Sequence, residues 1–318
     1  MIRAALLAPA VVACGLVACG LGACGRSQGV SDQQLGSLVV EPKSSDAAID
    51  LDRAGREPAE LGRALARPYT KVIGALGLHT VAVNTATVIE EAGQPVSELT
   101  DHTTIENAEG GGYRAVYTNS ADYGRETLYL PAAPAAEPAA KARAASGMLY
   151  LRPRYQRWHG RPPEAPEEPL VLRDAYYGAI AATWELIAHA AELTDRGAVE
   201  VGGRAGRKIE IKLAPGAAKP PRETLTQRAW REGRSVEALT GEVVLDAEHG
   251  APLGLTIAAT IGFSREGRSF LMKVKLDSTT SGIGAPVALA APPAAEVVAT
   301  PGRLREVDDR DFLLQGMA

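Results

Sequence analysis

The chain has 318 residues, and 34 Lys and Arg against 38 Asp and Glu give a formal net charge of −4 at pH 7. A hydrophobic fraction of 46% excludes a polytopic membrane protein, and 23% charged residues with little net charge argue against a wholly disordered chain. The slightly acidic balance gives no electrostatic reason to expect a nucleic-acid partner. The length suits one large domain or two small ones.

The first 24 residues have the composition of an export signal. Arg3 precedes an apolar stretch in which alanine comes before each of the chain's three cysteines, at Ala13-Cys14, Ala18-Cys19 and Ala23-Cys24. A basic start, an apolar segment and small residues before a cleavage site are typical of a secretory signal. We therefore expect residues 1–23 to be a signal peptide. The alternative, an uncleaved membrane-spanning helix, is weakened by three glycines in the same stretch.

Two segments, Leu16-Val17-Ala18-Cys19 and Leu21-Gly22-Ala23-Cys24, resemble the lipobox of bacterial lipoproteins. In that family the cysteine thiol is diacylated, the peptide bond before it is cleaved, and the new amino terminus is acylated. The resemblance implies a lipid anchor at Cys24, with Cys19 as the alternative. Cys24 is favoured because cleavage there leaves no unpaired thiol in an oxidising compartment. Two or three acyl chains suffice for stable attachment to a membrane.

The residue after each cysteine is glycine, whereas Asp at that position favours retention in the inner membrane among Gram-negative lipoproteins. The sequence therefore resembles a lipoprotein destined for the outer membrane, and we expect a lipid-anchored protein that faces the periplasm. Residues 24–56 are rich in Ser, Gly, Asp and Gln and predict a flexible tether. A single domain is expected over 57–292, with a Pro/Ala insertion at 131–147 and a tail at 293–318.

Alternating β-branched residues from His79 to Ile89, including Val81 and Val83, predict a strand with one buried face. Other short strands are expected at 113–117, 126–130, 148–151, 198–201, 207–213, 239–246, 253–264, 270–277 and 286–289. The polar cluster at 101–104 predicts a loop. Turns with Gly are expected at 248–250 and 265–268.

Two helices are expected. Pro58 favours a short one over 59–66, which Pro68 ends or kinks. A long central helix is predicted over 174–194 with Asp174 as its N-cap, and its apolar stripe includes Tyr177, Ile180, Trp184 and Ile187. Runs of strands with few helices predict an antiparallel α+β domain.

The segment 239–253, with Asp246, Gly250 and Pro252, resembles the late strand, turn and Pro-bearing strand of the LolA/LolB and LppX/LprG-like lipoproteins. The ending 283–292 is similar to the last edge strand of the mycobacterial members. The resemblance covers about 79–292 and implies a large curved antiparallel sheet, a half-open barrel, wrapped around one long central helix and a short N-terminal helix. The Pro/Ala insertion departs from the compact members of these families.

The resemblance also implies an apolar cavity for acyl chains. Its candidate lining residues are Tyr177, Ile180, Trp184, Ile187, Val81, Val83, Ile89, Ile257, Ile261 and Phe263. The alternative is that all of them belong to an ordinary core. Alanine-rich faces leave more space for a ligand than Leu or Phe would.

A basic segment stands out in this acidic protein. Its side chains Arg152, Arg154, Arg157, Trp158 and Arg161 are candidates for binding lipid headgroups or the membrane surface, since Arg pairs with phosphate and Trp lies at headgroup level. The alternative is a solvated strand end that pairs with Glu164, Glu167 and Glu168.

No catalytic motif is present, and the five histidines are scattered. Glu185 and His189 supply only two possible ligands, so we predict no metal, no cofactor and no enzymatic activity. Two hypotheses follow. The first is an anchored envelope lipoprotein that binds a lipid or other amphiphile, with a role in lipid or lipoprotein trafficking. The second is a non-catalytic lipoprotein that binds an envelope protein or senses envelope stress and carries no ligand.

Overall fold

The computed structural model describes residues 47–132, 147–216, 228 and 232–299, all of which fall in one compact unit that begins at Ser37. The predictions of the signal peptide and of lipidation at Cys24 or Cys19 lie outside the described residues. The same holds for most of the Pro/Ala insertion and of the C-terminal tail. No helix in the described part of the chain is long and apolar enough to span a membrane.

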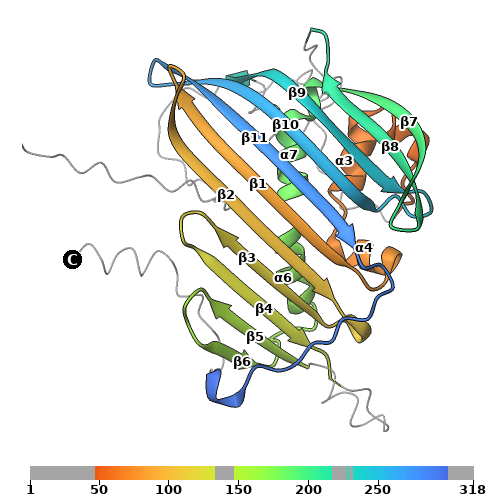
Figure 1. The fold of residues 1–318 in the computed structure, drawn as a ribbon, viewed down its shortest axis with the longest axis vertical. Helices are drawn as coiled ribbons and strands as arrows, with labels where there is room; N and C mark the ends of the chain where they lie inside the picture. Colours follow the sequence, from red (N-terminus) through yellow and green to blue (C-terminus); the bar gives the residue numbers. More distant parts are fainter. Residues whose placement is uncertain (1–46, 133–146, 217–227, 229–231, 300–318) are drawn as a thin grey trace, which may run out of the picture. The chain divides into compact units, whose positions relative to one another are not determined.

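Twelve described strands form one open sheet in the order β12-β6-β5-β4-β3-β2-β1-β11-β10-β9-β8-β7 (Figure 1). All neighbouring pairs are antiparallel except β12 with β6. The strands are β1 (Thr80–Glu91), β2 (Gln94–Asn107), β3 (Tyr113–Asn119), β4 (Gly124–Leu130), β5 (Met148–Pro153), β6 (Trp158–Arg161), β7 (Ala191–Val201), β8 (Arg204–Leu213), β9 (Arg234–Asp246), β10 (Pro252–Arg265), β11 (Arg268–Ser281) and β12 (Val297–Ala299). The predicted α+β fold with a large antiparallel sheet is confirmed.

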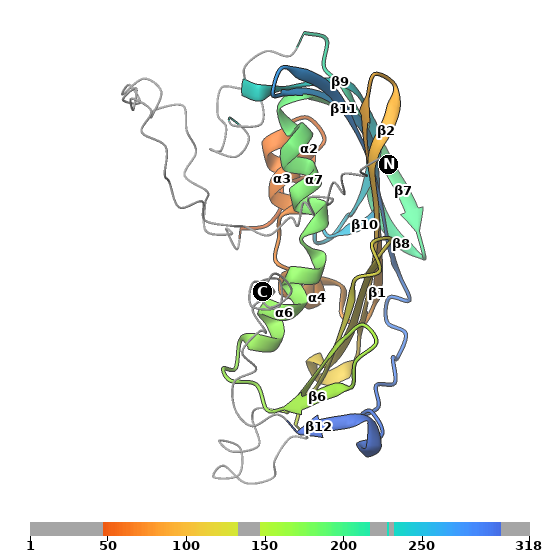
Figure 2. The same ribbon diagram turned by 90° about the vertical axis from the view of Figure 1, so that its left-hand side faces the viewer.

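The helices lie on one side of the sheet, which curves around them at one end (Figure 2). They are α2 (Leu51–Ala54), α3 (Pro58–Leu65), α4 (Tyr69–Leu76), α6 (Glu168–Tyr177) and α7 (Ala179–Ile187), with short 3₁₀ turns η1 (Glu109–Gly111), η2 (Ala188–Ala190) and η3 (Ala294–Glu296). We call the face of the sheet toward the helices the inner face. Side chains of one parity cover it, such as Val81, Ile105 and Leu276, and all three are buried in the common core. This architecture is the half-open sheet that the resemblance implied.

The predicted central helix differs from the observed one at both ends. The observed helix begins at Glu168, with Pro169 in its first turn. It is divided into α6 and α7 at Gly178, whose backbone stays in the right-handed helical region. Asp174 is therefore not an N-cap but an interior residue of α6. At the other end, Ala191 and the residues after it pair with β8, because the strand ladder there outweighs the local helix propensity.

The polar cluster at 101–104, predicted as a loop, lies inside the 14-residue strand β2. Asp101 belongs there because its carboxylate accepts hydrogen bonds from Thr85 Oγ1 at 2.9 Å and Tyr117 Oη at 2.5 Å, on the two neighbouring strands. The expected strand at 286–289 does not form. Pro286, Pro292 and Pro293 lack the amide hydrogen that a strand ladder needs, and pairing resumes only at β12.

The folded region is longer than 57–292. Residues 47–56, assigned to the tether from composition, include α2, and Ile49 and Leu51 pack against the core. α3 corresponds to the predicted short helix, but α4 follows Pro68 and was not predicted. The turn at 248–250 is confirmed, with Gly250 at a φ of 67° and the Asp246 carboxylate accepting hydrogen bonds from the amides of Glu248 and His249.

A buried polar network joins α4 to the sheet. His79 Nδ1 lies 2.9 Å from the Gly77 carbonyl, so in the neutral ring it donates there and Nε2 accepts from the Tyr69 hydroxyl at 3.0 Å. Asn107 Nδ2 then donates to Tyr69 Oη at 2.7 Å and to the His79 carbonyl at 3.1 Å. Burial lowers the pKa of His79, and the charge of Arg173 acts in the same direction, whereas the Gly77 hydrogen bond raises it.

This network predicts a loss of stability in mild acid. The pKa of His79 is lower in the folded protein than in the unfolded chain, where it is about 6.5, so the unfolded chain binds the proton more readily. The free energy of unfolding should therefore fall as pH drops below about 6.5. Urea unfolding between pH 7.5 and 5 should show a weaker pH dependence for His79→Gln than for the wild type. An identical slope in the two proteins would contradict the assignment.

Replacement of glycine by alanine should have opposite effects on the free energy of unfolding at two helical positions. A Cβ at Gly62 of α3 would lie 2.9 Å from the indole nitrogen of buried Trp184, whereas a Cβ at Gly74 of α4 would meet nothing within 4 Å. Gly74→Ala should raise the free energy of unfolding by about 0.5–1 kcal/mol through helix propensity. Gly62→Ala should lower it by about 1 kcal/mol or more through overpacking. Denaturant titrations of both variants test the sign, and a stabilised Gly62→Ala would disprove this packing.

Candidate functional site

The side chains expected to line a cavity meet in the interior of the domain. Val81, Val83, Tyr177, Ile180, Trp184, Ile187, Ile257 and Ile261 are all buried and belong to one continuous core. Trp184 also donates from Nε1 to the Pro58 carbonyl at 3.3 Å, which holds α7 against α3. The structure thus brings these residues together and fills the space between α7 and the sheet with their side chains. Their role as a ligand lining stays a prediction.

The inner face also carries apolar side chains near the β10–β11 hairpin, where four strands lie side by side. We call the six inner-face side chains there the apolar strip: Ile89, Val236, Ile261, Phe263, Phe270 and Met272.

The register places the apolar strip on one face. Ile89 pairs with Met272, Met272 with Ile261 and Ile261 with Val236, so one apolar row crosses four strands. In the next row Phe263 and Phe270 are directly opposite, with stacked rings 5.3 Å apart. Ile261 is buried and the other five are half-buried. Phe263, predicted as a cavity residue, therefore lies in this half-buried part of the inner face.

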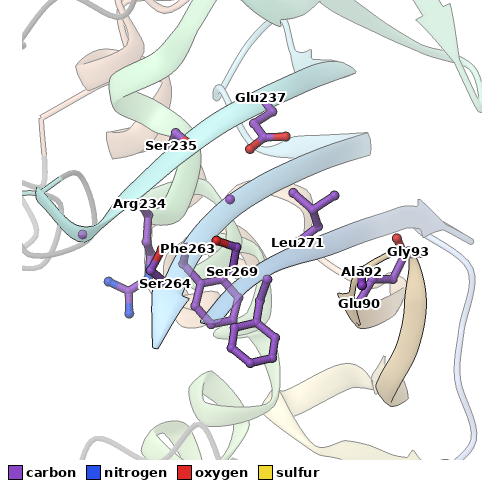
Figure 3. A pocket seen from close by; sticks show the side chains of 13 residues that line it. Glu90, Ala92, Gly93, Arg234, Ser235, Glu237, Phe263, Ser264, Ser269 and Leu271 are labelled. Atoms are coloured by element: carbon purple, nitrogen blue, oxygen red, sulfur yellow. The ribbon is translucent and has the colours of Figure 1, made fainter. Parts of the chain in front are cut away.

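A cleft of about 490 Å³ surrounds this end of the sheet (Figure 3). Phe263, Phe270 and Arg234 belong to the inner-face row of its lining, whereas Ser264 and Ser269 come from the row on the opposite face. Burial lowers the pKa of Arg234. Leu271, which also lines the cleft, pairs with Glu90 and Gly262 and so lies on the opposite face from Phe270. The volume is within the range of small-molecule sites, and the cleft combines apolar rings with a polar rim.

A second hollow, of about 570 Å³, lies on the outer face over β1, β2 and β3. Its lining is polar and includes Asn84, His102, Thr118, Lys275 and Asp277. His102 Nδ1 is hydrogen-bonded to Asn84 Oδ1, and Thr104 Oγ1 lies 3.2 Å from His102 Nε2. No apolar side chain suited to an acyl chain lines this hollow, so it does not resemble an amphiphile site.

The basic segment does not form one cationic surface. Arg152 pairs with Glu126 and stacks 4.4 Å from the Trp158 ring, which is itself buried. Arg154 pairs with Asp122 at 3.0 Å, and Arg157 donates to the Ala295 carbonyl. Arg161 is buried and pairs with Glu168. Of the three glutamates that the alternative interpretation considered as partners, only Glu168 forms an ion pair among the described contacts. Binding of headgroups by these residues is not tested and stays a prediction.

The most unusual polar side chain in the interior, Arg173 of α6, was not among the predicted site residues. It is 2% exposed, and its guanidinium lies 5.1 Å from the ring centre of Tyr113 and 5.6 Å from that of Tyr69. Nε and Nη1 have no hydrogen-bond partner among the described residues. This position lies one residue before the predicted helix of 174–194, and the sequence pattern offered no signal that it faces the sheet.

In the described part of the chain, no three His, Cys, Asp or Glu side chains are grouped so that they could hold a metal ion.

Comparison with known proteins finds no matching family model and no matching curated protein. Among solved structures, the chain is similar to the lipoprotein LppX of Mycobacterium tuberculosis, with 13% identity, 71% of this chain and 98% of the other covered, and a TM-score of 0.26. LprF of Mycobacterium bovis has 14% identity, coverage of 76% and 100%, and a TM-score of 0.27. A LolA-superfamily protein of Nitrosomonas europaea has 6% identity, coverage of 70% and 94%, and a TM-score of 0.21. These proteins come from the families that the sequence resembles.

Proposed function

We propose that the protein is a lipid-anchored lipoprotein of the bacterial envelope that binds an amphiphile on the inner face of its sheet. The anchor is assigned to the lipobox cysteine, Cys24, and the location to the periplasmic side of the outer membrane. The observation that carries ligand binding is the apolar strip, which continues the buried core along the inner face toward the hairpin and ends at Phe263 and Phe270, two residues that also line the cleft of about 490 Å³. An acyl chain laid there would remove apolar surface from water at about 25 cal/mol per Å².

The polar rim supports an amphiphile rather than a purely apolar ligand. In the row that contains Phe263 and Phe270, the flanking residues are Arg234 on one side and Glu91 on the other. Glu91 is paired with Arg268 of the hairpin. In an amphiphile bound along this row, the apolar chain would contact the two phenylalanine rings at the centre, and the polar end would contact a charged residue at the margin. No step in this function requires a catalytic group or a cofactor.

The alternative, a lipoprotein that binds another envelope protein, is favoured by the open edges of the sheet. β7 and β12 each pair with one neighbour only among the described strands. β7, however, carries the charged residues Glu192, Asp195 and Arg196 and has an irregular register between Asp195 and Gly197. Charges and bulges on an edge strand discourage the addition of another strand. The apolar strip therefore supports the first function better.

Binding of a fluorescent fatty acid tests the proposed site. The wild type should bind the probe and should also carry extractable lipid in native mass spectrometry when it is purified without detergent. Phe270→Ser should weaken probe binding by about tenfold or more, because a large apolar contact is lost. Val96→Ser is the matched control, since Val96 is an exposed apolar residue of β2 that does not line the cleft, and it should bind nearly as well as the wild type. Absence of both lipid and probe uptake in the wild type would refute the function.

A further inference from the structure

The interior beneath α6 contains a positive charge whose hydrogen-bonding capacity is mostly unused. Arg173 is 2% exposed, and Nε and both N–H bonds of Nη1 have no partner among the described residues. Nη2 makes only a long contact, 3.5 Å, with Thr70 Oγ1 of α4. No ion pair among the described residues includes Arg173. A guanidinium carries five N–H donors and keeps its charge at physiological pH, so this position is costly for the folded protein.

The two tyrosine rings fix the guanidinium but do not neutralise it. The ring centres of Tyr69 and Tyr113 lie 5.6 and 5.1 Å from the guanidinium carbon, and the Tyr113 hydroxyl donates to the Pro169 carbonyl at 2.8 Å. Cation–π contacts contribute about 0.5–2 kcal/mol each, whereas an unpaired buried ion costs several kcal/mol. The charge of Asp174, the next residue in the chain, raises the pKa of Arg173, but its carboxylate accepts hydrogen bonds from the Thr70 amide at 3.1 Å and from Thr70 Oγ1 at 3.3 Å, not from the guanidinium.

No described residue of the sheet forms an ion pair with the guanidinium. The nearby network of Tyr69, His79 and Asn107 is neutral, and burial lowers the pKa of both His79 and Arg173. In the same network Asn107 Oδ1 is a buried acceptor without a partner among the described residues. The region thus offers three guanidinium N–H donors and one amide acceptor between α4, α6 and the sheet.

We propose that Arg173 is the receptor for an anionic group, a phosphate or a carboxylate, that enters between α4 and α6. Charge-assisted hydrogen bonds from a guanidinium to either group are strong and directional, and they would satisfy the donors that the protein leaves unused. A protonated oxygen of the same ligand would suit Asn107 Oδ1. The anion could be free or could be the headgroup of an amphiphile. This site does not depend on binding at the apolar strip, which lies at the other end of the strands.

Thermal unfolding of the full chain in a detergent with a neutral headgroup tests the proposal. The probes are inorganic phosphate, hexyl phosphate and, as a neutral match, hexanol. At saturation an anion should raise the Tm of the wild type by about 5 °C. A response to inorganic phosphate would identify a site for free anions, and a response to hexyl phosphate alone would identify a headgroup site. Stabilisation by hexanol equal to that by hexyl phosphate would overturn recognition of the charge.

Three variants separate a binding role from a structural one. Arg173→Met should unfold at a higher temperature than the wild type without ligand, because an apolar side chain removes the unpaired charge, and it should lose the response to phosphate. Arg173→Lys keeps the positive charge and should show a reduced stabilisation by phosphate. This variant keeps the test decisive if Arg173→Met does not fold. Val171→Ser, on the exposed side of α6, is the control and should respond like the wild type. The proposal is overturned if no anion stabilises the wild type, or if Arg173→Met responds equally.

Discussion

The packing of α7 on the inner face of the sheet is the constraint on which the rest of the domain depends. A sheet of this size with one apolar face cannot remain exposed to water, and here a single layer of helices covers that face. Trp184 anchors the layer, because its indole contacts Gly62 of α3 and donates to the Pro58 carbonyl. Beneath α7 the side chains fill the interior, whereas five of the six side chains of the apolar strip are half-buried.

Two sets of buried polar groups differ in how many of their hydrogen bonds are made. The contacts of Tyr69, His79 and Asn107 form a neutral network in which most hydrogen-bonding groups are satisfied. Arg173, on the neighbouring helix, keeps its charge with most of its donors unused. A domain selected for stability alone would gain by replacing such a residue with an apolar one. Its presence in an otherwise ordinary core is the physical reason to assign it to a ligand.

The apolar strip and the surroundings of Arg173 lie toward opposite ends of the strands. The helical layer covers the inner face, and near the β10–β11 hairpin five of the six side chains of the apolar strip are half-buried. The layer is also divided at Gly178 into two segments, of which α6 contacts α4, β2 and β3. Each end of the layer thereby presents a different chemistry, apolar at the hairpin and cationic beneath α6.

By itself the sequence determined the features that depend on local chemistry. Alternation of β-branched residues located β1 and most later strands, Pro58 and Gly250 marked a helix start and a turn, and the lipobox predicted the anchor. β2 was missed because Asp101 looks like a loop residue until Thr85 and Tyr117 lie beside it on adjacent strands.

Tertiary structure decided everything that depends on which elements lie side by side. The register of β10 and β11 set Phe263 against Phe270, and pairing with β8 ended the central helix near Ala190 instead of at residue 194. It also separated the arginines of the basic segment into individual contacts and buried Arg173. Periodicity shows that a side chain is on an apolar or polar stripe. It does not show what lies opposite, and that neighbour determines whether a charge is solvated, paired or left for a ligand.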